Sequence, residues 1–412
     1  MSEKRDVLFL CQFFYPEYVS SATLPYDTAL ALVKSGFSVS ALCGFPHEYN
    51  RNGEVQMEED QEGIMIKRLK YIQLKRSNFI GRLINYFSFT FVVALHFFSL
   101  RNYKSIIAYS NPPVLPLIAA LAKKCFKLKM IFVCYDVYPE MAHITKSISE
   151  NGLLSKLMKF INNIVYKNVD RVVALSNEMK EYLLQNREQL HEHQVEVIPN
   201  WYDDKPIDDV SKSYLNNKFS DLKPNESLIV SYFGNLGVCQ DLDTILDAIR
   251  VLKDDNEIKF VFAGHGSKMD QLKKSIKDEC LDKAFVYDFL HGQDFQDALN
   301  ISDVFLVSLL DGLTGLAVPS KIYSYMMAGK PVIAIMGRNS DISKDLLENN
   351  AGFALEVGEV ESLVNSIENL RNEKILRVEM GLNIRRIFEE KYTTEKSTSK
   401  YVEMIKRELE GK

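Results

Sequence analysis

Short runs of consecutive apolar residues alternate along the chain with longer segments in which apolar residues recur every three or four positions. The run VLFLCQFF, residues 7–14, is typical of a strand buried on both faces of a parallel sheet. Residues 23–36 have helical periodicity and end at a glycine, and a second apolar run follows at 37–43. Strand, helix and strand in this order predict the opening unit of a doubly wound α/β fold.

The alternation continues to residue 198, stops, and begins again at residue 228. Between these points, residues 204–226 are rich in Asp, Lys, Asn, Ser and Pro, which predicts a linker. A chain of 412 residues is also too long for one ordinary core. We therefore predict an α/β protein with two Rossmann-like, doubly wound parallel-sheet domains that face a cleft. Their bounds are 1–203 and 227–385, followed by a C-terminal helix, 386–412, that can cross back to the first domain.

The strand runs predict where ligands bind, because parallel sheets bind them at the carboxyl ends of their strands. Further strands are predicted at 105–109, 130–135, 171–175, 195–198, 228–233, 259–263, 285–289, 304–309, 331–336 and 353–357. Helices are predicted at 114–124, 153–167, 242–252, 269–277 and 295–300, from 343 and 360, and in the last forty residues. Glycine follows four strands of the second domain, which lets backbone amides approach a ligand closely.

One of these loops, residues 311–332, leads through Pro319 into a helix that starts near Ser320 and stops at Gly329 after about three turns. The free N–H groups of a helix start attract anions, and Lys321 adds a full positive charge. Two interpretations are open at this point: a phosphate-binding turn, or an ordinary turn with a solvated lysine.

Four motifs in the second half of the chain, together with two in the first, carry a family resemblance. They are VIPN (197–200), FGNLG (233–237), AGHG (263–266), VPSK (318–321), MAGKPV (327–332) and DVYPE (136–140). In this order they resemble glycosyltransferase family 4, which are retaining, metal-independent enzymes of the GT-B fold. The resemblance is to bacterial members that build capsule, O-antigen or colanic-acid polysaccharides, and it covers nearly the whole chain.

The resemblance implies a division of labour between the two domains. The second domain would hold a nucleotide-sugar donor, most often a UDP-sugar, and the first would hold the acceptor. Asp136 and Lys321 are the implied catalytic residues, although Asp136 could equally cap the turn that follows its strand. Implied donor-binding residues are Gly234, Asn235, Gly237, Gly264, His265, Gly266, Leu290, His291, Gly315, Leu316, Ser320, Lys321 and Ser324. Acceptor-binding candidates are Glu17, Tyr138 and Glu140, of which Glu140 could instead be solvated.

The sequence departs from the family pattern at several of these positions. Relatives often have Arg at the position of Asn235 and Lys near Gln240, and two glutamates near Leu316 and Ser324. One cation, Lys321, remains from the usual set. Loss of a charge-assisted hydrogen bond costs donor binding roughly 1.5–3 kcal/mol where nothing replaces it.

Composition adds information on compartment and partners. A net charge of −5 argues against nucleic acid, yet residues 63–135 contain no Asp or Glu and twelve Lys or Arg. The segment 83–100 contains no Asp, Glu, Lys or Arg, and it could span a membrane, form a core helix, or lie partly in a membrane surface or lipid-acceptor groove. The last is favoured by its basic surroundings, 67–129. Six scattered cysteines predict buried, reduced thiols, and no disulfide or metal site.

These observations predict a hexosyl- or N-acetylhexosaminyl-type glycosyltransferase without a cofactor, acting in the cytoplasm or at the inner face of the cell membrane. Its acceptor would be a polyprenyl-linked or growing glycan. Another GT-B reaction, such as epimerisation or phosphorolysis, is a rival within enzymes. A non-catalytic GT-B subunit that recognises substrate for a partner enzyme is the alternative outside them.

Overall fold

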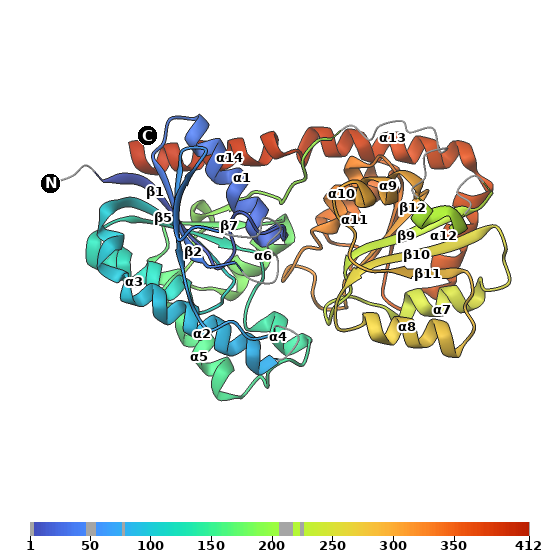
Figure 1. Ribbon diagram of the computed structural model, residues 1–412, viewed down its shortest axis with the longest axis horizontal. Coiled ribbons are helices and arrows are strands. Elements are labelled where there is room, and N and C mark those ends of the chain that lie inside the picture. Colours follow the sequence, from blue (N-terminus) through green and yellow to red (C-terminus); the bar gives the residue numbers. More distant parts are fainter. Residues whose placement is uncertain (1–3, 47–54, 76–78, 206–216, 223–225, 412) are drawn as a thin grey trace. The chain divides into compact units, whose positions relative to one another are not determined.

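The computed structural model describes residues 4–46, 55–75, 79–205, 217–222 and 226–411 of the chain. Two compact units are present (Figure 1). Unit 1 comprises Met1–Trp201, Gly315–Val318 and Thr394–Lys412, and unit 2 comprises Tyr202–Thr314 and Pro319–Thr393. The chain therefore contributes a short loop and its C-terminal segment to unit 1 after it has begun unit 2.

Unit 1 is built on an eight-stranded sheet in the order β3-β4-β2-β1-β5-β6-β7-β8, in which only the β3–β4 pair is antiparallel. The strands are β1 (Arg5–Leu10), β2 (Val39–Gly44), β3 (Glu58–Gln61), β4 (Ile64–Leu69), β5 (Tyr103–Tyr109), β6 (Lys129–Cys134), β7 (Arg171–Ala174) and β8 (Val195–Val197). The helices are α1 (Ser20–Lys34), α2 (Phe79–Leu95), η1 (Phe97–Asn102), α3 (Pro116–Phe126), α4 (Glu140–Ile144), α5 (Leu153–Asn168), α6 (Asn177–Asn186), η2 (Glu192–Gln194) and α14 (Thr394–Glu410). Figure 1 shows α1 and α14 together on one side of this sheet and α2, α3 and α5 on the other.

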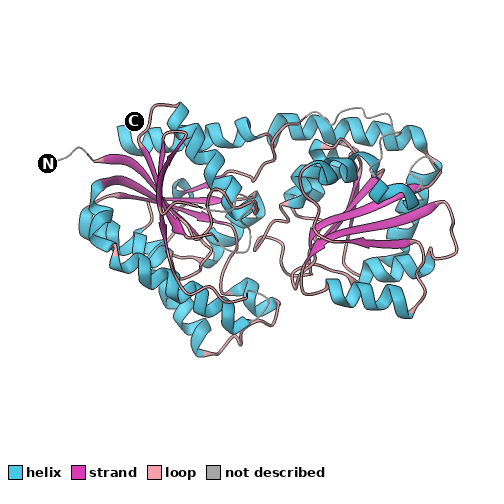
Figure 2. Ribbon diagram, in the orientation of Figure 1, coloured by secondary structure: helices cyan, strands magenta, loops and turns pink. Residues whose placement is uncertain are grey.

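Unit 2 is built on a six-stranded, wholly parallel sheet in the order β11-β10-β9-β12-β13-β14 (Figure 2). The strands are β9 (Leu228–Asn235), β10 (Ile258–His265), β11 (Ala284–Tyr287), β12 (Val304–Ser308), β13 (Val332–Ile335) and β14 (Gly352–Leu355). The helices are η4 (Asn217–Leu222), α7 (Asp243–Val251), α8 (Met269–Asp278), α9 (Gln293–Ile301), α10 (Lys321–Met327), α11 (Asp341–Glu348), α12 (Val360–Asn372) and α13 (Lys374–Lys391). The prediction of two doubly wound parallel-sheet domains is confirmed. That their strand ends face a common cleft stays a prediction.

Several elements differ from the sequence prediction. The hairpin β3–β4 and helix α6 were not predicted, because β3 reads EEDQ and α6 reads NEMKEYLLQN, so neither shows an apolar run. Part of the predicted linker, 206–216 and 223–225, lies outside the described residues. Its described part forms η4, where Phe219 is buried with its ring 5.2 Å from that of Tyr287.

The cysteine prediction was only half right. Cys11, Cys43 and Cys134 are buried, Cys239 is partly buried, and Cys125 and Cys280 are exposed. The exposed pair lies at or after a helix end, where an apolar neighbourhood in sequence does not mean burial in space. All six are free thiols.

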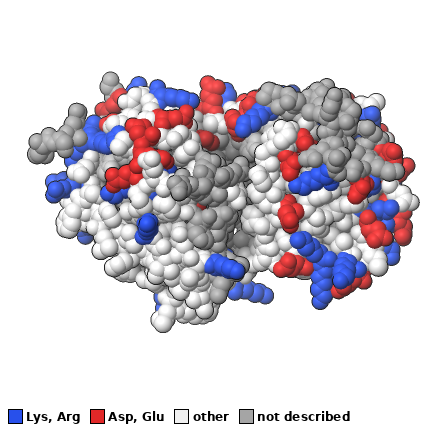
Figure 3. Space-filling view, viewed as in Figure 1, with Lys and Arg blue, Asp and Glu red and all other residues white. Residues whose placement is uncertain are grey.

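The apolar segment 83–100 lies mostly in α2, and its contact with a membrane surface stays a prediction. Within the described residues, no helix has both the length and the apolar content needed to cross a bilayer. The helix differs from a core helix, because six of its large apolar side chains are exposed: Phe79, Ile80, Ile84, Phe87, Phe91 and Leu95. In Figure 3 the lower part of the left-hand unit, over α2 and α5, is white with scattered blue and no red.

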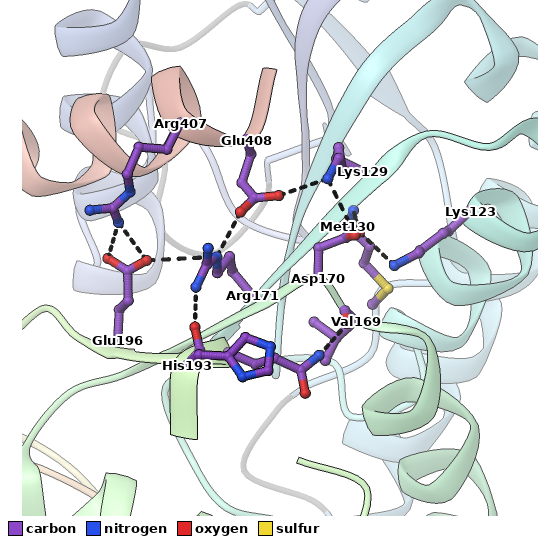
Figure 4. Close-up of polar contacts among 11 residues, drawn as sticks. Lys123, Lys129, Met130, Val169, Asp170, Arg171, His193, Glu196, Arg407 and Glu408 are labelled. Atoms are coloured by element: carbon purple, nitrogen blue, oxygen red, sulfur yellow. Dashed lines mark hydrogen bonds and ion pairs between the residues drawn. The ribbon is translucent and has the colours of Figure 1, made fainter. Parts of the chain in front are cut away.

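The C-terminal helix α14 is joined to the sheet of unit 1 by ion pairs (Figure 4). The Glu408 carboxylate accepts hydrogen bonds from Lys129 Nζ at 3.0 Å and from Arg171 Nε at 2.7 Å. The neighbouring Arg407 contacts both oxygens of Glu196 at 2.6 Å. The Arg171 guanidinium also donates to the carbonyl of His193. Helix α14 is therefore held to β6, β7 and β8 at once.

Replacing Glu408 with Gln should lower the free energy of unfolding by about 1–2 kcal/mol, since two charge-assisted hydrogen bonds at a partly solvated site are weakened. Burial raises the pKa of Glu408, but hydrogen bonds from Arg171 and Lys129 outweigh it and hold the pKa below its usual 4.5. The stabilisation that ionised Glu408 contributes is complete above pH 4.5 and is lost as the pH falls through its folded-state pKa.

Urea denaturation of the wild type and Glu408→Gln at pH 7 and at pH 3.5 measures the loss in free energy of unfolding. The loss caused by the substitution should be larger at pH 7. Glu403→Gln is the matched control, because Glu403 lies exposed on the same helix and forms no ion pair with a described residue. Equal losses in the two variants would contradict the assignment.

Candidate functional site

The carboxyl ends of β9 and β10 in unit 2 form a glycine-lined backbone surface. The two strands run in register to their last residues, so that Gly234 lies beside Gly264 and Asn235 beside His265. A Cβ atom on Gly264 would lie 2.0 Å from the Gly234 carbonyl oxygen, and φ is +146° there. No other residue fits this position without moving the backbone. Since β9 has β10 on one side and β12 on the other, this is also the point where strand order reverses.

Lys321, the first residue of α10, reaches over the end of β9. Its Nζ donates to the Tyr232 hydroxyl at 2.8 Å and to the Asn235 carbonyl at 3.1 Å, and lies 4.5 Å from the centre of the Tyr232 ring. The side chain passes Gly234 so closely that a Cβ there would be 3.4 Å from Lys321 Cε. Glycine at 234 therefore leaves room for the ammonium group to cross the strand end.

The ammonium group of Lys321 has no carboxylate partner among the described residues. Its surroundings are a phenol oxygen, a peptide carbonyl and an aromatic face, and burial lowers its pKa from 10.5 to about 7. Nearby, the pKa of His265 is also lowered, first by burial and then by the charge of Lys321. Below pH 7, where Lys321 is protonated, the site therefore holds a positive charge without a described carboxylate partner, which is the condition for binding an anion.

Helix α10 is shorter than predicted, with seven residues, about two turns. It is fixed to β9 by Tyr325, whose hydroxyl donates to the Phe233 carbonyl at 2.8 Å and accepts from the Phe233 amide at 2.7 Å. Ser324, at the position of a family glutamate, is buried and donates to the Lys321 carbonyl at 2.8 Å. Ser320 precedes Lys321 as the residue before the helix and makes no side-chain cap.

A second cation, Lys268, was missed by the sequence analysis. Its Nζ donates to the Gln240 carbonyl at 2.6 Å, while the Gln240 side chain accepts from the Gly237 amide at 2.8 Å. The loop after β10 thus brings a lysine to the loop after β9, where relatives have a lysine near the position of Gln240. A periodicity analysis cannot find it, because its partner is a backbone carbonyl rather than a motif residue.

The other predicted donor residues lie in two places. Leu290 and His291 follow β11, the strand beside β10, and the ring of Phe289 lies 5.4 Å from that of His265. Gly266 packs on the Leu236 carbonyl, which a Cβ would approach to 2.2 Å. Gly315 and Leu316 belong instead to unit 1 by their contacts.

In unit 1, the loop residues 315–318 lie against the end of β6. Ala317 forms an isolated antiparallel bridge with Asp136, and the Val137 amide donates to the Leu316 carbonyl at 2.8 Å. Gly315, with φ +83°, packs against the Glu178 carbonyl of α6. The structure thus brings two predicted donor residues beside the predicted catalytic Asp136.

Asp136 is a partly buried residue. Its backbone amide donates to Ser110 Oγ at 3.1 Å, but no described residue forms a hydrogen bond or ion pair with its carboxylate. Burial raises its pKa from 3.8 to about 6. A cap on the following turn would show a side-chain bond to a backbone amide, and none is present, which favours a ligand-facing role.

The three predicted acceptor residues have different surroundings. Glu140 pairs with Arg187 at 2.8 Å, and the same guanidinium donates to the Tyr138 carbonyl at 3.3 Å. Arg187 therefore holds the loop after β6 in place. Glu17, after β1, is buried. That these residues bind an acceptor stays a prediction.

Two family models match separate parts of the chain. Residues 22–201 match the glycosyl transferase 4-like domain, and residues 214–387 match glycosyl transferases group 1. The chain is a glycosyltransferase of the GT-B fold. The two matches correspond to the two parallel-sheet units, and the second contains Lys321 and its glycine-lined surroundings.

Curated relatives of this glycosyltransferase are also glycosyltransferases. The probable glycosyltransferase WbjE of Pseudomonas aeruginosa is 26% identical over 64% of this chain and 65% of its own length. The putative colanic acid biosynthesis glycosyl transferase WcaI of Escherichia coli is 24% identical over 53% of each chain. The alignments thus span less than two thirds of the relatives they match.

Solved structures share the fold across the whole glycosyltransferase. HepE of Anabaena, solved in complex with UDP-glucose, has a TM-score of 0.71 at 16% identity, covering 97% of this chain and 99% of that one. WaaG, a glycosyltransferase involved in lipopolysaccharide biosynthesis, has a TM-score of 0.67 at 13% identity with the same coverage. At these identities the likeness establishes the fold.

Lys321→Met should raise the thermal midpoint of the glycosyltransferase at pH 6, because it removes the cost of burying a cation without a carboxylate. The folded-state pKa of Lys321, about 7, lies below the usual 10.5, so the cost is complete below pH 7 and declines between pH 7 and 10.5. Differential scanning fluorimetry at pH 6 and pH 9 should show a larger gain at pH 6. A lower midpoint than wild type at pH 6 would show that the contacts of the lysine outweigh its burial cost.

Proposed function

We propose that this protein is a retaining, metal-independent glycosyltransferase that uses a UDP-sugar as its donor. The proposed acceptor is a polyprenyl-linked or growing glycan, and the proposed process is the synthesis of a bacterial surface polysaccharide such as a capsule or O-antigen. The sugar is proposed to be a hexose or an N-acetylhexosamine. Relatives support the process: WcaI is named for colanic acid biosynthesis and WaaG for lipopolysaccharide biosynthesis.

The observation that carries the proposal is the uncompensated ammonium group of Lys321 at the glycine-lined end of β9. A diphosphate is a multiply charged anion whose oxygens accept hydrogen bonds from ammonium and backbone N–H groups. Gly234 lets the lysine and the backbone reach the same point, and Lys268 brings a second cation to the neighbouring loop. In this sequence Asn235 and Gln240 stand where relatives often have Arg and Lys. Lys321 and Lys268 supply positive charge in their place.

The proposed reaction needs little covalent help from the protein. The acceptor hydroxyl oxygen attacks the anomeric carbon on the face from which the nucleotide leaves, the bond from that carbon to the β-phosphate oxygen breaks, and the departing phosphate takes the hydroxyl proton. The products are the glycoside, with its configuration retained, and a nucleoside diphosphate. Negative charge grows on the leaving phosphate, so Lys321 stabilises the transition state more than the ground state.

Asp136 is proposed to contact the reacting sugar or the incoming hydroxyl. The residue is partly buried and its carboxyl group has no described partner, so a hydroxyl would satisfy it without displacing an internal bond. The bridge to Ala317 fixes its backbone beside Gly315 and Leu316. In this role the ionised form acts as a hydrogen-bond acceptor, and its protonation would remove that function.

A non-catalytic role in a partner's complex remains the second candidate, because the charges that relatives carry at the positions of Asn235, Gln240 and Ser324, among others, are absent. Two of these side chains are engaged within the chain itself: Gln240 with the Gly237 amide and Ser324 with the Lys321 carbonyl. A subunit of this kind would bind a donor or an acceptor but would turn over neither. Donor hydrolysis by the purified chain alone distinguishes the two.

Saturating UDP-sugar should stabilise the wild type, by about 2.7 kcal/mol at 100 times its dissociation constant. Fluorimetry with UDP-glucose and UDP-N-acetylglucosamine, each against free UDP and ADP-glucose, identifies the donor. Lys321→Met should lose the stabilisation, since the diphosphate loses its cation, and Lys268→Met should reduce it. Lys277→Met, an exposed lysine on α8 without a described ion pair, should not.

The same variants test catalysis. Lys321→Met should raise the barrier of donor turnover by roughly 2–4 kcal/mol, as expected for a lost oxyanion donor. If the wild type binds a UDP-sugar and no hydrolysis or transfer follows, the non-catalytic role is the correct one. Unchanged turnover in Lys321→Met would remove this lysine from the mechanism.

Asp136→Asn should lower donor turnover by roughly 100-fold or more, the lower range for a positioned carboxylate, and leave the donor-induced stabilisation intact. Because burial raises the pKa of Asp136 to about 6, wild-type rates should fall as the pH drops through 6, and the variant should lack this limb. Initial rates from pH 5 to 8 measure both effects. A variant within threefold of the wild type would assign Asp136 a structural role only.

A further inference from the structure

Helix α2 is apolar on its inner face and on its outer face. Ile80, Ile84, Phe87, Phe91 and Leu95 follow the spacing of one helix face, and all five are exposed. On the buried face, Phe89 and Val93 lie beside Asn85, which bonds the backbone of Leu74 through both its amide nitrogen and its oxygen, each at 2.8 Å. A surface helix in water instead carries polar and charged residues on its outer face.

The pattern continues on neighbouring elements of the same side of the sheet. Helix α3 packs against α2, η1 and α5, and the ring of Phe97 in η1 lies 5.1 Å from that of Phe126 in α3. Exposed apolar side chains continue there: Phe98 of η1 is 73% exposed, and Leu153 and Phe160 of α5 are 86% and 62% exposed. We call the exposed large apolar residues of these elements the α2–α5 surface; they are Phe79, Ile80, Ile84, Phe87, Phe91, Leu95, Phe98, Leu121, Leu153, Leu157 and Phe160.

Within these elements the charge has one sign, and the exposed Glu150 lies three residues before α5. None of α2, η1, α3 and α5 contains an Asp or Glu. Seven lysines and arginines in or directly after these elements form no ion pair with a described residue: Arg82, Arg101, Lys124, Lys127, Lys156, Lys159 and Lys167. By contrast, several cations of the predicted basic stretch 67–129 are neutralised, among them Arg68 by Glu59 and Lys123 by Asp170.

We propose that the α2–α5 surface docks unit 1 on an anionic lipid bilayer. The apolar side chains of α2, η1 and α5 enter the headgroup region, and the surrounding lysines and arginines face lipid phosphates. The proposal moves the expected membrane contact from the stretch 67–129 to a surface shared with α5, a helix that lies outside that stretch. It extends the proposed function, because a polyprenyl-linked acceptor resides in such a membrane.

Charge favours a bilayer over the other candidate occupant, a second copy of this chain. A two-fold dimer would place the surface against itself and oppose cations to cations, with no acidic residue on α2, η1, α3 or α5 to pair with them. An anionic leaflet instead offers phosphates for the cations and acyl chains for Phe91, Leu95 and Phe160. A helix lying in the interface with Phe and Leu buried and Lys and Arg at its margin has this composition.

Flotation on a density gradient tests the proposal with the full chain and vesicles of phosphatidylcholine alone or with 30% phosphatidylglycerol. The wild type should float with the anionic vesicles, less in 1 M salt than in 0.1 M, and poorly with neutral vesicles. The double variant Phe91→Glu with Phe160→Glu should lose at least tenfold in partitioning. Ile375→Glu with Leu382→Glu is the matched control, because these α13 residues of unit 2 are equally exposed and should leave binding unchanged.

Three results would overturn the proposal: wild type that stays with the buffer in all vesicles, a Phe91/Phe160 variant that floats as well as the wild type, or a wild-type dimer that this variant dissociates. Circular dichroism of each variant excludes loss of folding as the cause. Donor-induced stabilisation, measured in parallel, depends on unit 2 residues. Its failure would refute the proposed function and leave vesicle binding as a separate outcome.

Discussion

An ammonium group held without a carboxylate organises the donor side of this glycosyltransferase. Lys321 donates to a phenol oxygen and a peptide carbonyl, and an aromatic ring lies beneath its charge. Neutral hydrogen-bond partners do not fully offset the free energy of desolvating a cation, and the lowered pKa of Lys321 reflects this remaining cost. A bound diphosphate would remove this cost by pairing with the ammonium group. The fold therefore tolerates a local instability that a substrate can relieve, as expected for a site under functional selection.

The glycines at the ends of β9 and β10 are the backbone counterpart of this lysine. Gly264 lies so close to the Gly234 carbonyl that any side chain would collide with it. This contact holds the two strand ends in register, and glycine at position 234 leaves room for the Lys321 side chain to cross the end of β9. Tyr325 then fixes α10 to β9 through both backbone groups of Phe233, so that Lys321 starts from a rigid helix. The ammonium group of Lys321 can move only by rotation of its own side chain, because the surrounding backbone is pre-organised.

The sequence allowed most of the fold to be predicted, because parallel strands buried on both faces are continuous apolar runs. The exposed antiparallel strand β3 and the polar helix α6 carry no such signal and were missed. Within the candidate site, Lys321 and the glycine loops could be found from local motifs. Lys268 could not, since its position depends on a carbonyl that every residue has. The packing of residues 315–318 against Asp136 is a contact through space between segments about 180 residues apart, and no periodicity encodes it.

Helix α2 shows a further limit of hydropathy as a guide. Its composition fits a core helix and an interfacial helix equally well, and only the direction of each face separates them. The structure places Asn85 inside, where its amide satisfies two backbone groups of Leu74, and leaves Phe91 and Leu95 outside. Phe89 and Val93 share the inner face with Asn85, so both faces of the helix are apolar. The outward apolar face, repeated nearby on α5, costs free energy in water, and the proposed lipid surface would remove that cost.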